Sequence, residues 1–137
     1  VEDEVTVTYP DPCRLGRQMG IYDEPRDLVN SVEGVKLVEM EHSGEDAMCC
    51  GVSSMMSCNE NARSLRVSRM EEIRNTGADM MITSCPKCVS HFECLKFEDD
   101  EKYDIEILDV VSFLARQVEA KKQVHSEPVS THVPAEA

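Results

Sequence analysis

Seven cysteines are the residues of this sequence best suited to chemistry. An odd number suits a disulfide framework poorly, and adjacent cysteines pair only through a strained ring. We therefore expect free thiols in a reducing compartment, where clustered cysteines usually bind metals or carry out redox chemistry. Five of the cysteines form one pattern. Cys13 stands alone, Cys49 and Cys50 are adjacent and precede Gly51, and Cys85 and Cys88 form a Cys-x-x-Cys pair.

The number of sulfurs limits the kind of metal site. A structural zinc ion is satisfied by four ligands. An iron–sulfur cluster, which proteins hold mainly through thiolates, can use a fifth sulfur. Three other interpretations stay open: a zinc site, unligated buried thiols, or a thioredoxin-like redox pair formed by Cys85 and Cys88 alone.

The remaining cysteines and the nearby histidines are expected to have ordinary roles. Cys58 and Cys94 are predicted to be buried structural thiols. His42 and His91 lie close to the motif cysteines in sequence, but most single histidines are neither ligands nor proton carriers. No catalytic residue is assigned.

Alternating strand and helix patterns predict an α/β fold, a small Rossmann-like, mainly parallel sheet with flanking helices. Apolar and β-branched runs predict the strands, at 5–9, 35–40, 80–83 and 105–108. Turn and capping residues delimit the helices, at 25–32, from Asn59 or Asn61 to 75, at 86–97 and at 110–121. On the last helix, Val110, Val111, Leu114 and Val118 are spaced as a core-facing stripe.

This order of elements brings the cysteines together. In an open parallel sheet, functional groups gather at the carboxyl ends of the strands. Cys13 follows the first predicted strand, the Cys49-Cys50 pair lies in the loop after the second, and Cys85 with Cys88 comes directly after the third. We therefore expect all five sulfurs at one edge of the sheet.

Composition excludes several other functions. The chain has 27 acidic and 14 basic residues, a formal charge of -13, and few aromatic side chains. These values argue against a nucleic acid or an anionic membrane surface as a partner. No apolar run approaches the roughly 20 residues of a membrane span, and the start of the chain lacks a secretory signal, so a cytoplasmic protein without direct membrane insertion is expected.

The chain length suits a single domain. We predict one cysteine-rich domain over residues 1–122 and a disordered tail over 123–137, which lacks apolar periodicity. The chain starts without an initiator methionine, and we expect a processed chain or a piece of a longer protein.

The cysteine pattern and its flanks resemble the cysteine-rich CCG domain found in the B and D subunits of heterodisulfide reductases. The same module occurs in iron–sulfur subunits of glycolate and lactate oxidation and of anaerobic respiratory complexes. The resemblance covers about Val5 to Val118. The flanking segments that agree are Tyr9–Arg17 (YPDPCRLGR), Tyr22–Arg26 (YDEPR), Gly34–Met40 (GVKLVEM), Gly77–Asp79 and Cys85-Pro86.

This resemblance implies a specific cofactor and partners. In heterodisulfide reductases the complete motif holds a non-cubane [4Fe–4S] cluster that cleaves a disulfide. By resemblance, the cluster and metal ligands here are Cys13, Cys49, Cys50, Cys85 and Cys88. Family subunits commonly carry two such motifs, so the implied partners are a second CCG domain and a ferredoxin-like electron donor, with attachment to a membrane complex through partners. The chain looks like the C-terminal CCG unit of a longer subunit.

Two features depart from the family pattern or from the overall charge. The family commonly has a glycine-rich run after Cys-Cys-Gly, whereas this chain has Val52–Cys58 (VSSMMSC), in which Met55 and Met56 could line an apolar pocket. Arg63, Arg66 and Arg69 form a basic stripe on the long helix, and we interpret it as a solvated face rather than a site for an anionic ligand.

Three functions compete at this point. The first is an iron–sulfur redox subunit, part of an oxidoreductase that reduces a disulfide or a related sulfur substrate. The second is an electron-transfer module with the same cluster and no substrate of its own. The third is a structural domain that holds zinc, which an isolated fragment prepared in air could also acquire.

Overall fold

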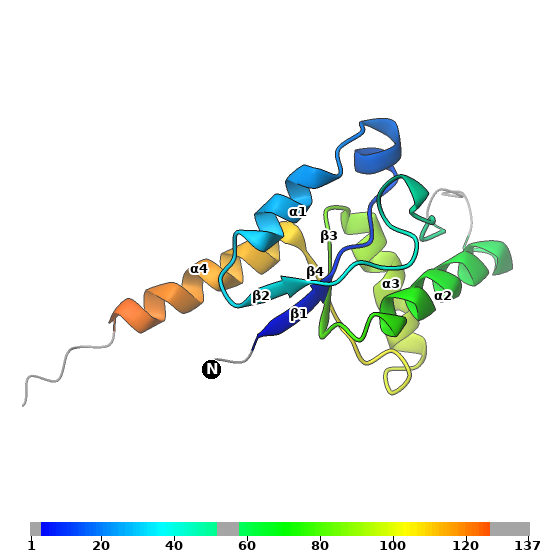
Figure 1. The fold of residues 1–137 in the computed structure, drawn as a ribbon. Coiled ribbons are helices and arrows are strands. Elements are labelled where there is room, and N and C mark those ends of the chain that lie inside the picture. Colours follow the sequence, from blue (N-terminus) through cyan, green and yellow to red (C-terminus); the bar gives the residue numbers. More distant parts are fainter. Residues whose placement is uncertain (1–3, 52–57, 127–137) are drawn as a thin grey trace, which may run out of the picture.

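The structure is a computed structural model, and it describes residues 4–51 and 58–126. Its centre is a four-stranded sheet in the order β2-β1-β3-β4, and every pair of neighbouring strands is parallel. The strands are β1 (Val5–Thr8), β2 (Val35–Leu37), β3 (Met80–Thr83) and β4 (Glu106–Asp109). The predicted α/β class is therefore confirmed (Figure 1).

Helices cover both faces of the sheet. They are α1 (Asp23–Asn30), α2 (Glu60–Asn75), α3 (Pro86–Glu98) and α4 (Val110–Ser126). On one face, Val29 of α1 and Phe113 of α4 pack with Val7 and Ile82 of the sheet. On the other, α2 and α3 pack against Met81 and the residues around β4. Parallel sheets need this two-sided cover because both of their faces are apolar.

Local signals set the starts of the helices. The side chain of Asn59 accepts a hydrogen bond from the Ala62 N–H at 3.0 Å and so caps α2. Asp109 accepts bonds from the N–H groups of Val111 and Ser112 and caps α4. Pro86 occupies the first turn of α3, where its missing N–H costs nothing.

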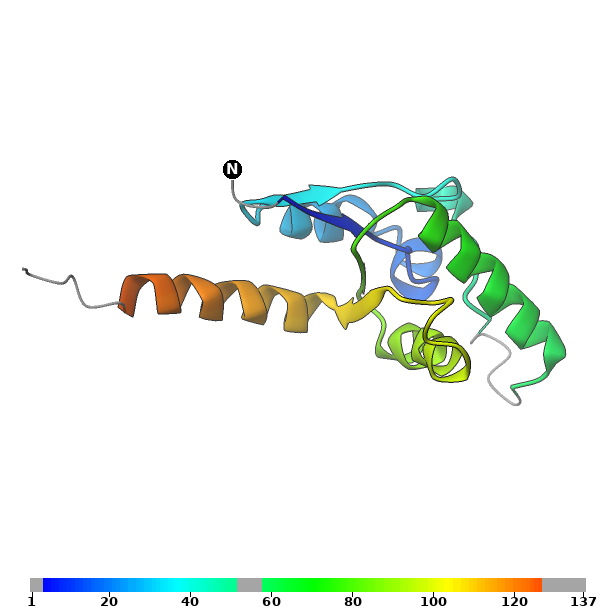
Figure 2. The same ribbon diagram turned by 90° about the horizontal axis from the view of Figure 1, so that it is seen from below.

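The last helix, α4, exposes side chains that were predicted to face the core. Val111 is 70% exposed and Val118 is 54% exposed, whereas Phe113 is fully buried. The expected core-facing stripe is wrong at the two valines for different reasons. Val111 lies in the first turn but outside the face that Val110, Phe113 and Leu114 pack against the sheet, and Val118 lies beyond these turns. The helix continues to Ser126, beyond the predicted end at Lys121, and Figure 2 shows it projecting away from the sheet. Most of the predicted tail, 127–137, lies outside the described residues.

Two short elements that were not predicted lie in the connections. A π-helical turn, η1 (Arg14–Gln18), follows Cys13, and a 3-10 turn, η2 (Gly44–Asp46), precedes the Cys49-Cys50 pair. The second strand is also shorter than expected, since β2 ends at Leu37 rather than Met40. The chain therefore passes from strand into loop earlier. The loop after β1 carries Cys13, and the loop after β2 carries Cys49 and Cys50.

Candidate cysteine-rich site

The described structure brings the motif cysteines to the carboxyl edge of the sheet. Cys13 follows β1 and precedes η1. Cys85 is the N-cap residue of α3, immediately after β3, and places Cys88 in the first turn of that helix. The loop after β2 carries Cys49 and Cys50. The expected gathering at one edge therefore agrees with the topology.

Four of the five motif cysteines line one small cavity: Cys13, Cys49, Cys50 and Cys88. Within it, the sulfurs of Cys50 and Cys88 are 3.3 Å apart, and both residues are buried. The Gly51 N–H donates to the Cys49 sulfur at 3.3 Å. Cys85 interacts with the Cys88 thiol from outside the cavity lining. The rest of the lining comes from Pro10, Asp11, Pro12, Met48, Arg69 and Phe92.

The pKa of the Cys88 thiol lies well above its ordinary range. Its hydrogen bond with Cys50 is the largest cause, followed by burial and by the charges of Cys50 and Cys85. A thiolate held among other sulfurs and away from water is unfavourable unless a cation compensates its charge. A coordinated metal ion does so, because it deprotonates a bound thiol outright.

The chemistry of the donors fits a thiolate-held metal centre. Sulfur ligands select zinc or iron–sulfur clusters over hard cations. Asp11 also lines the cavity, but its carboxylate accepts bonds from Arg26 and Gly44. Over residues 4–51 and 58–126, no group of three or more Cys, His, Asp or Glu side chains is close enough to hold a single metal ion. The ligand set therefore stays a prediction.

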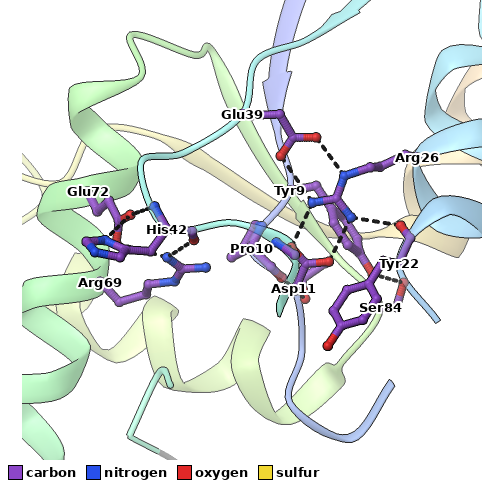
Figure 3. Close-up of polar contacts among 12 residues, drawn as sticks. Tyr9, Pro10, Asp11, Tyr22, Arg26, Glu39, His42, Arg69, Glu72 and Ser84 are labelled. Carbon is purple, nitrogen blue, oxygen red and sulfur yellow. Dashed lines mark hydrogen bonds and ion pairs between the residues drawn. The ribbon is translucent and has the colours of Figure 1, made fainter. Parts of the chain in front are cut away.

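An ion-pair network braces the two loops that carry Cys13 and Cys49 (Figure 3). Arg26 of α1 donates to both oxygens of Asp11 at 2.7 Å and to Glu39 beyond β2 at 2.6 Å. Asp11 in turn accepts from the Gly44 N–H at 2.8 Å. Bidentate pairs of this kind fix geometry as well as charge. The network links the chain after β1 to the chain after β2, beside the cavity.

Gly51 has a steric reason to follow the cysteine pair. Its φ is 94°, in the left-handed region, and a Cβ at this position would lie 2.4 Å from the carbonyl oxygen of Ala62. Only glycine accommodates both conditions without a shift of backbone. The turn therefore lets the Cys49-Cys50 segment pack closely against the start of α2.

Arg69 is a residue of the site that the sequence prediction missed. Instead of lying on a solvated stripe, Arg66 and Arg69 are 2% and 0% exposed, which makes the predicted interpretation wrong for these two residues. Arg69 Nη1 donates to the His42 carbonyl at 2.8 Å and to Glu72 at 2.9 Å. Arg63, by contrast, is exposed and pairs with Glu98. The two arginines lie on the same helical stripe as the buried side chains of α2: Ala62, Met70 and Ile73.

The structure also places the two remaining cysteines and the two histidines that lie near the motif in sequence. Cys58 and Cys94 are exposed rather than buried, so the expected structural thiols are wrong. His42 contacts Glu72 through Nδ1 at 3.0 Å. His91 Nδ1 accepts from Arg66 at 3.1 Å, and burial together with the Arg66 charge lowers its pKa. Met55 and Met56 lie outside the described residues.

Comparison with known proteins assigns the family. The family model described as CCG, cysteine-rich domain, matches residues 7–93, which include all five motif cysteines. The chain belongs to the CCG cysteine-rich domain family. The match spans β1 to α3, the elements that position the cysteine cavity.

Three curated relatives of this CCG domain are iron–sulfur or reductase proteins. The D subunit of a dihydromethanophenazine:CoB–CoM heterodisulfide reductase, from Methanosarcina acetivorans, is 36% identical over 113 residues, 81% of this chain and 27% of that protein. The B subunit of a fumarate reductase (CoM/CoB), from Methanothermobacter marburgensis, is 36% identical, over 79% of this chain and 22% of that protein. A probable iron-sulfur-binding oxidoreductase of Bacillus subtilis is 33% identical, over 82% of this chain and 16% of that protein.

The chain thus spans about a quarter or less of the length of these relatives. No solved structure matches it. Among the described residues, none of the helices combines the length and the apolar character needed to cross a membrane.

Proposed function

We propose that this CCG domain is an iron–sulfur redox domain of a heterodisulfide-reductase-like complex. One observation carries the proposal: four motif cysteines line one cavity at the carboxyl edge of the sheet, and the fifth interacts with one of them. The names of the relatives support an iron–sulfur redox role.

The five cysteines would be the ligands of a non-cubane [4Fe–4S] cluster: Cys13, Cys49, Cys50, Cys85 and Cys88. When bound, such a cluster supplies one-electron chemistry at sulfur. Pro10, Pro12 and Phe92 would limit water at the centre, because they form part of the same cavity wall. The Arg26–Asp11 pair would hold the Cys13 loop in place against the Cys49 loop.

The proposed substrate is a disulfide, and the proposed partners are other redox units. Reduction of one disulfide takes two electrons and two protons and gives two thiols. A centre that transfers one electron at a time therefore needs a second centre or a second delivery. We accordingly propose a second CCG domain and a ferredoxin-like electron donor as partners, with any membrane attachment made through such partners. Two of the relatives are named as subunits, which supports partner chains in general.

A zinc-binding structural domain is the alternative. Four cysteines around one cavity equal the ligand number of a structural zinc site. Zinc accepts tetrahedral sulfur without redox chemistry, so the two proposals differ in metal content and in electron uptake.

A stoichiometric disulfide assay tests the proposal. The protein is reconstituted anaerobically with iron and sulfide, reduced with dithionite, freed of excess reductant and mixed with a small aliphatic disulfide. We expect one disulfide to be cleaved for every two reduced centres. The centres should be oxidised at the same time, which the return of their visible absorbance would report. A Cys94→Ala control retains this reaction, because Cys94 is exposed and outside the motif.

Each other result has a distinct meaning. A centre that forms and accepts an electron but leaves the disulfide intact would assign the domain to electron transfer alone. A chain that takes up zinc but no iron and sulfide under the same conditions would contradict the redox proposal.

A further inference from the structure

A buried arginine side chain faces the cysteine cavity. Arg69 of α2 is fully buried and lines this cavity together with Cys13, Cys49, Cys50 and Cys88. Guanidinium groups remain charged in proteins and carry five N–H donors. A permanently charged side chain that is closed to water therefore shares one small cavity with four cysteines.

Arg69 is anchored on the side away from the cavity. Its Nη1 donates to the His42 carbonyl at 2.8 Å and to Glu72 at 2.9 Å. Glu72 also accepts from the backbone N–H and the Nδ1 of His42, at 3.0 Å for Nδ1. Burial alone would raise the pKa of Glu72, but the bonds from His42 and Arg69 outweigh it and lower that pKa. The carboxylate that holds Arg69 is therefore charged near neutral pH.

The other terminal nitrogen of Arg69 finds no hydrogen-bond partner among the described residues. Nη2 is buried, and no atom in the described structure accepts from it. Figure 3 shows this nitrogen pointing away from Glu72 and toward the segment that carries Pro10 and Asp11. Unmet buried donors are rare in folded proteins and cost roughly 1–3 kcal/mol each, so their presence in a site needs an explanation.

The cavity offers few acceptors for this donor. The Asp11 carboxylate already accepts from Arg26 and Gly44. Pro10, Pro12, Met48 and Phe92 have apolar side chains, and the remaining lining residues are the four cysteines. A negatively charged sulfur centre is the acceptor that fits a free guanidinium N–H here.

We infer that Arg69 donates its free N–H to a sulfur of the metal centre and stabilises the reduced form of that centre. This inference rests on the proposed function, because it needs a redox-active centre in the cavity. Each added electron increases the negative charge beside Arg69. Hydrogen bonds to the sulfurs are among the factors that set the potential of such a centre.

Arg66 provides a matched control on the same helix. It is 2% exposed, so it is buried like Arg69, and its Nη1 contacts His91 at 3.1 Å and the Cys58 sulfur at 3.5 Å. It is not among the residues that line the cysteine cavity. Loss of its charge tests whether any buried positive charge on α2 has the same effect.

The experiment is a dye-mediated redox titration of the anaerobically reconstituted chain, followed by electron paramagnetic resonance. Wild type is compared with Arg69→Gln, Arg69→Lys and Arg66→Gln. At a fixed ambient potential, we expect Arg69→Gln to lower the ratio of reduced to oxidised centre about tenfold, equivalent to 59 mV for one electron. Arg69→Lys keeps the charge but loses the planar fork and is expected to give a smaller decrease. Arg66→Gln should stay within about twofold of wild type, because it lacks the cavity contact.

The outcomes separate this inference from the proposed function. An unchanged ratio in Arg69→Gln with an intact centre, or an equal decrease in Arg66→Gln, would overturn the role of Arg69 and leave the redox function standing. If Arg69→Gln does not retain the centre, Arg69→Lys decides, and an unchanged ratio in that variant overturns the inference. A wild-type chain that acquires no iron–sulfur centre overturns both.

Discussion

The two faces of the sheet pack against different kinds of side chain. On the side of α1 and α4, the buried hydrophobic cluster consists of aliphatic and aromatic side chains without cysteine: Val7, Val29, Met80, Ile82 and Phe113. On the side of α2 and α3, the core includes Cys50 and Cys88, and α2 adds the buried charges of Arg66 and Arg69. Apolar burial is sufficient to explain the first side, since it stabilises a fold without any directional requirement.

The second side carries costs that stability alone does not explain. Four buried side-chain atoms lack hydrogen-bond partners within the part of the chain that the structure describes. One is Thr8 Oγ1 of β1, and the other three belong to α2 and α3: Arg66 Nε, Arg69 Nη2 and His91 Nε2. Buried polar atoms are otherwise nearly always paired. Both sides therefore stabilise the fold by apolar packing, and the α2/α3 side in addition places an unpaired donor of Arg69 in the lining of the cysteine cavity.

A pair of matched phenylalanine substitutions gives the largest expected effect. Phe113 and Phe92 are both fully buried, one on each side of the sheet. Each change to alanine should lower the free energy of unfolding by about 3–5 kcal/mol, because it leaves a cavity in a packed core. Only Phe92→Ala should also weaken metal retention, since Phe92 lines the cysteine cavity.

Chemical denaturation and metal analysis of the folded protein measure these two effects separately. If Phe113→Ala released metal as readily as Phe92→Ala at equal stability, the division between the two sides would be wrong.

Gly51→Ala is expected to have an intermediate effect. It tests whether the turn after the Cys49-Cys50 pair shapes the cysteine cavity. The new Cβ would meet the Ala62 carbonyl oxygen at 2.4 Å, and the positive φ of 94° disfavours any L side chain. We expect a loss of about 1–3 kcal/mol in unfolding free energy and a lower metal content per folded chain. Gly77→Ala is a suitable control, because Gly77 also has a positive φ, 69°, but open space around its Cβ position.

The control should lose stability and keep its metal. Equal metal content in the two variants would show that the tight turn after Cys50 does not shape the site.

Asp79→Asn should have the smallest effect, because it acts at the amino end of β3, far along the strand from the cysteines. The Asp79 carboxylate accepts bonds from the Thr6 hydroxyl at 2.6 Å and the Thr6 N–H at 2.9 Å, and these bonds lower its pKa. A carboxyl group with a lowered pKa in the folded state stabilises the fold above its unfolded pKa, and this stability is lost as the pH falls through the folded pKa.

The wild type should therefore lose this contribution below about pH 4, and the variant should show a shallower loss in the same range. Urea unfolding at several pH values measures it. If the free energy of unfolding depended on pH in the same way in both proteins, Asp79 would make no contribution to acid stability.

The sequence predicts the fold well where local signals and burial agree. The run Met80–Thr83 is apolar, lies between Gly77 and Pro86, and forms β3 with the predicted bounds. The Asn59 cap and the Pro86 start of α3 also follow from local chemistry. These positions are determined within a few residues of chain, so a single sequence is enough to find them.

The prediction is wrong where tertiary contacts override residue type. Charged side chains are almost always exposed, so Arg66 and Arg69 suggested a solvated stripe. Their spacing relative to Ala62, Met70 and Ile73 was the available signal, because these residues share one face of α2. Val111 and Val118 mislead in the opposite direction. Val111 lies off the face that Val110, Phe113 and Leu114 pack against the sheet, and no sequence pattern reveals that α4 leaves the sheet before Val118.

Iron and acid-labile sulfide content across a set of cysteine variants tests the central claim most directly. The claim is that the five motif cysteines hold one iron–sulfur centre and the other two do not. After anaerobic reconstitution, wild type, Cys58→Ala and Cys94→Ala should contain iron and sulfide in equal amounts, about four of each per chain for a [4Fe–4S] centre. Single alanine substitutions of Cys50 or Cys88, whose sulfurs are 3.3 Å apart in the cavity, should remove most of both. Wild-type chains that contain zinc without sulfide, or Cys88→Ala chains with full iron and sulfide, would contradict the account.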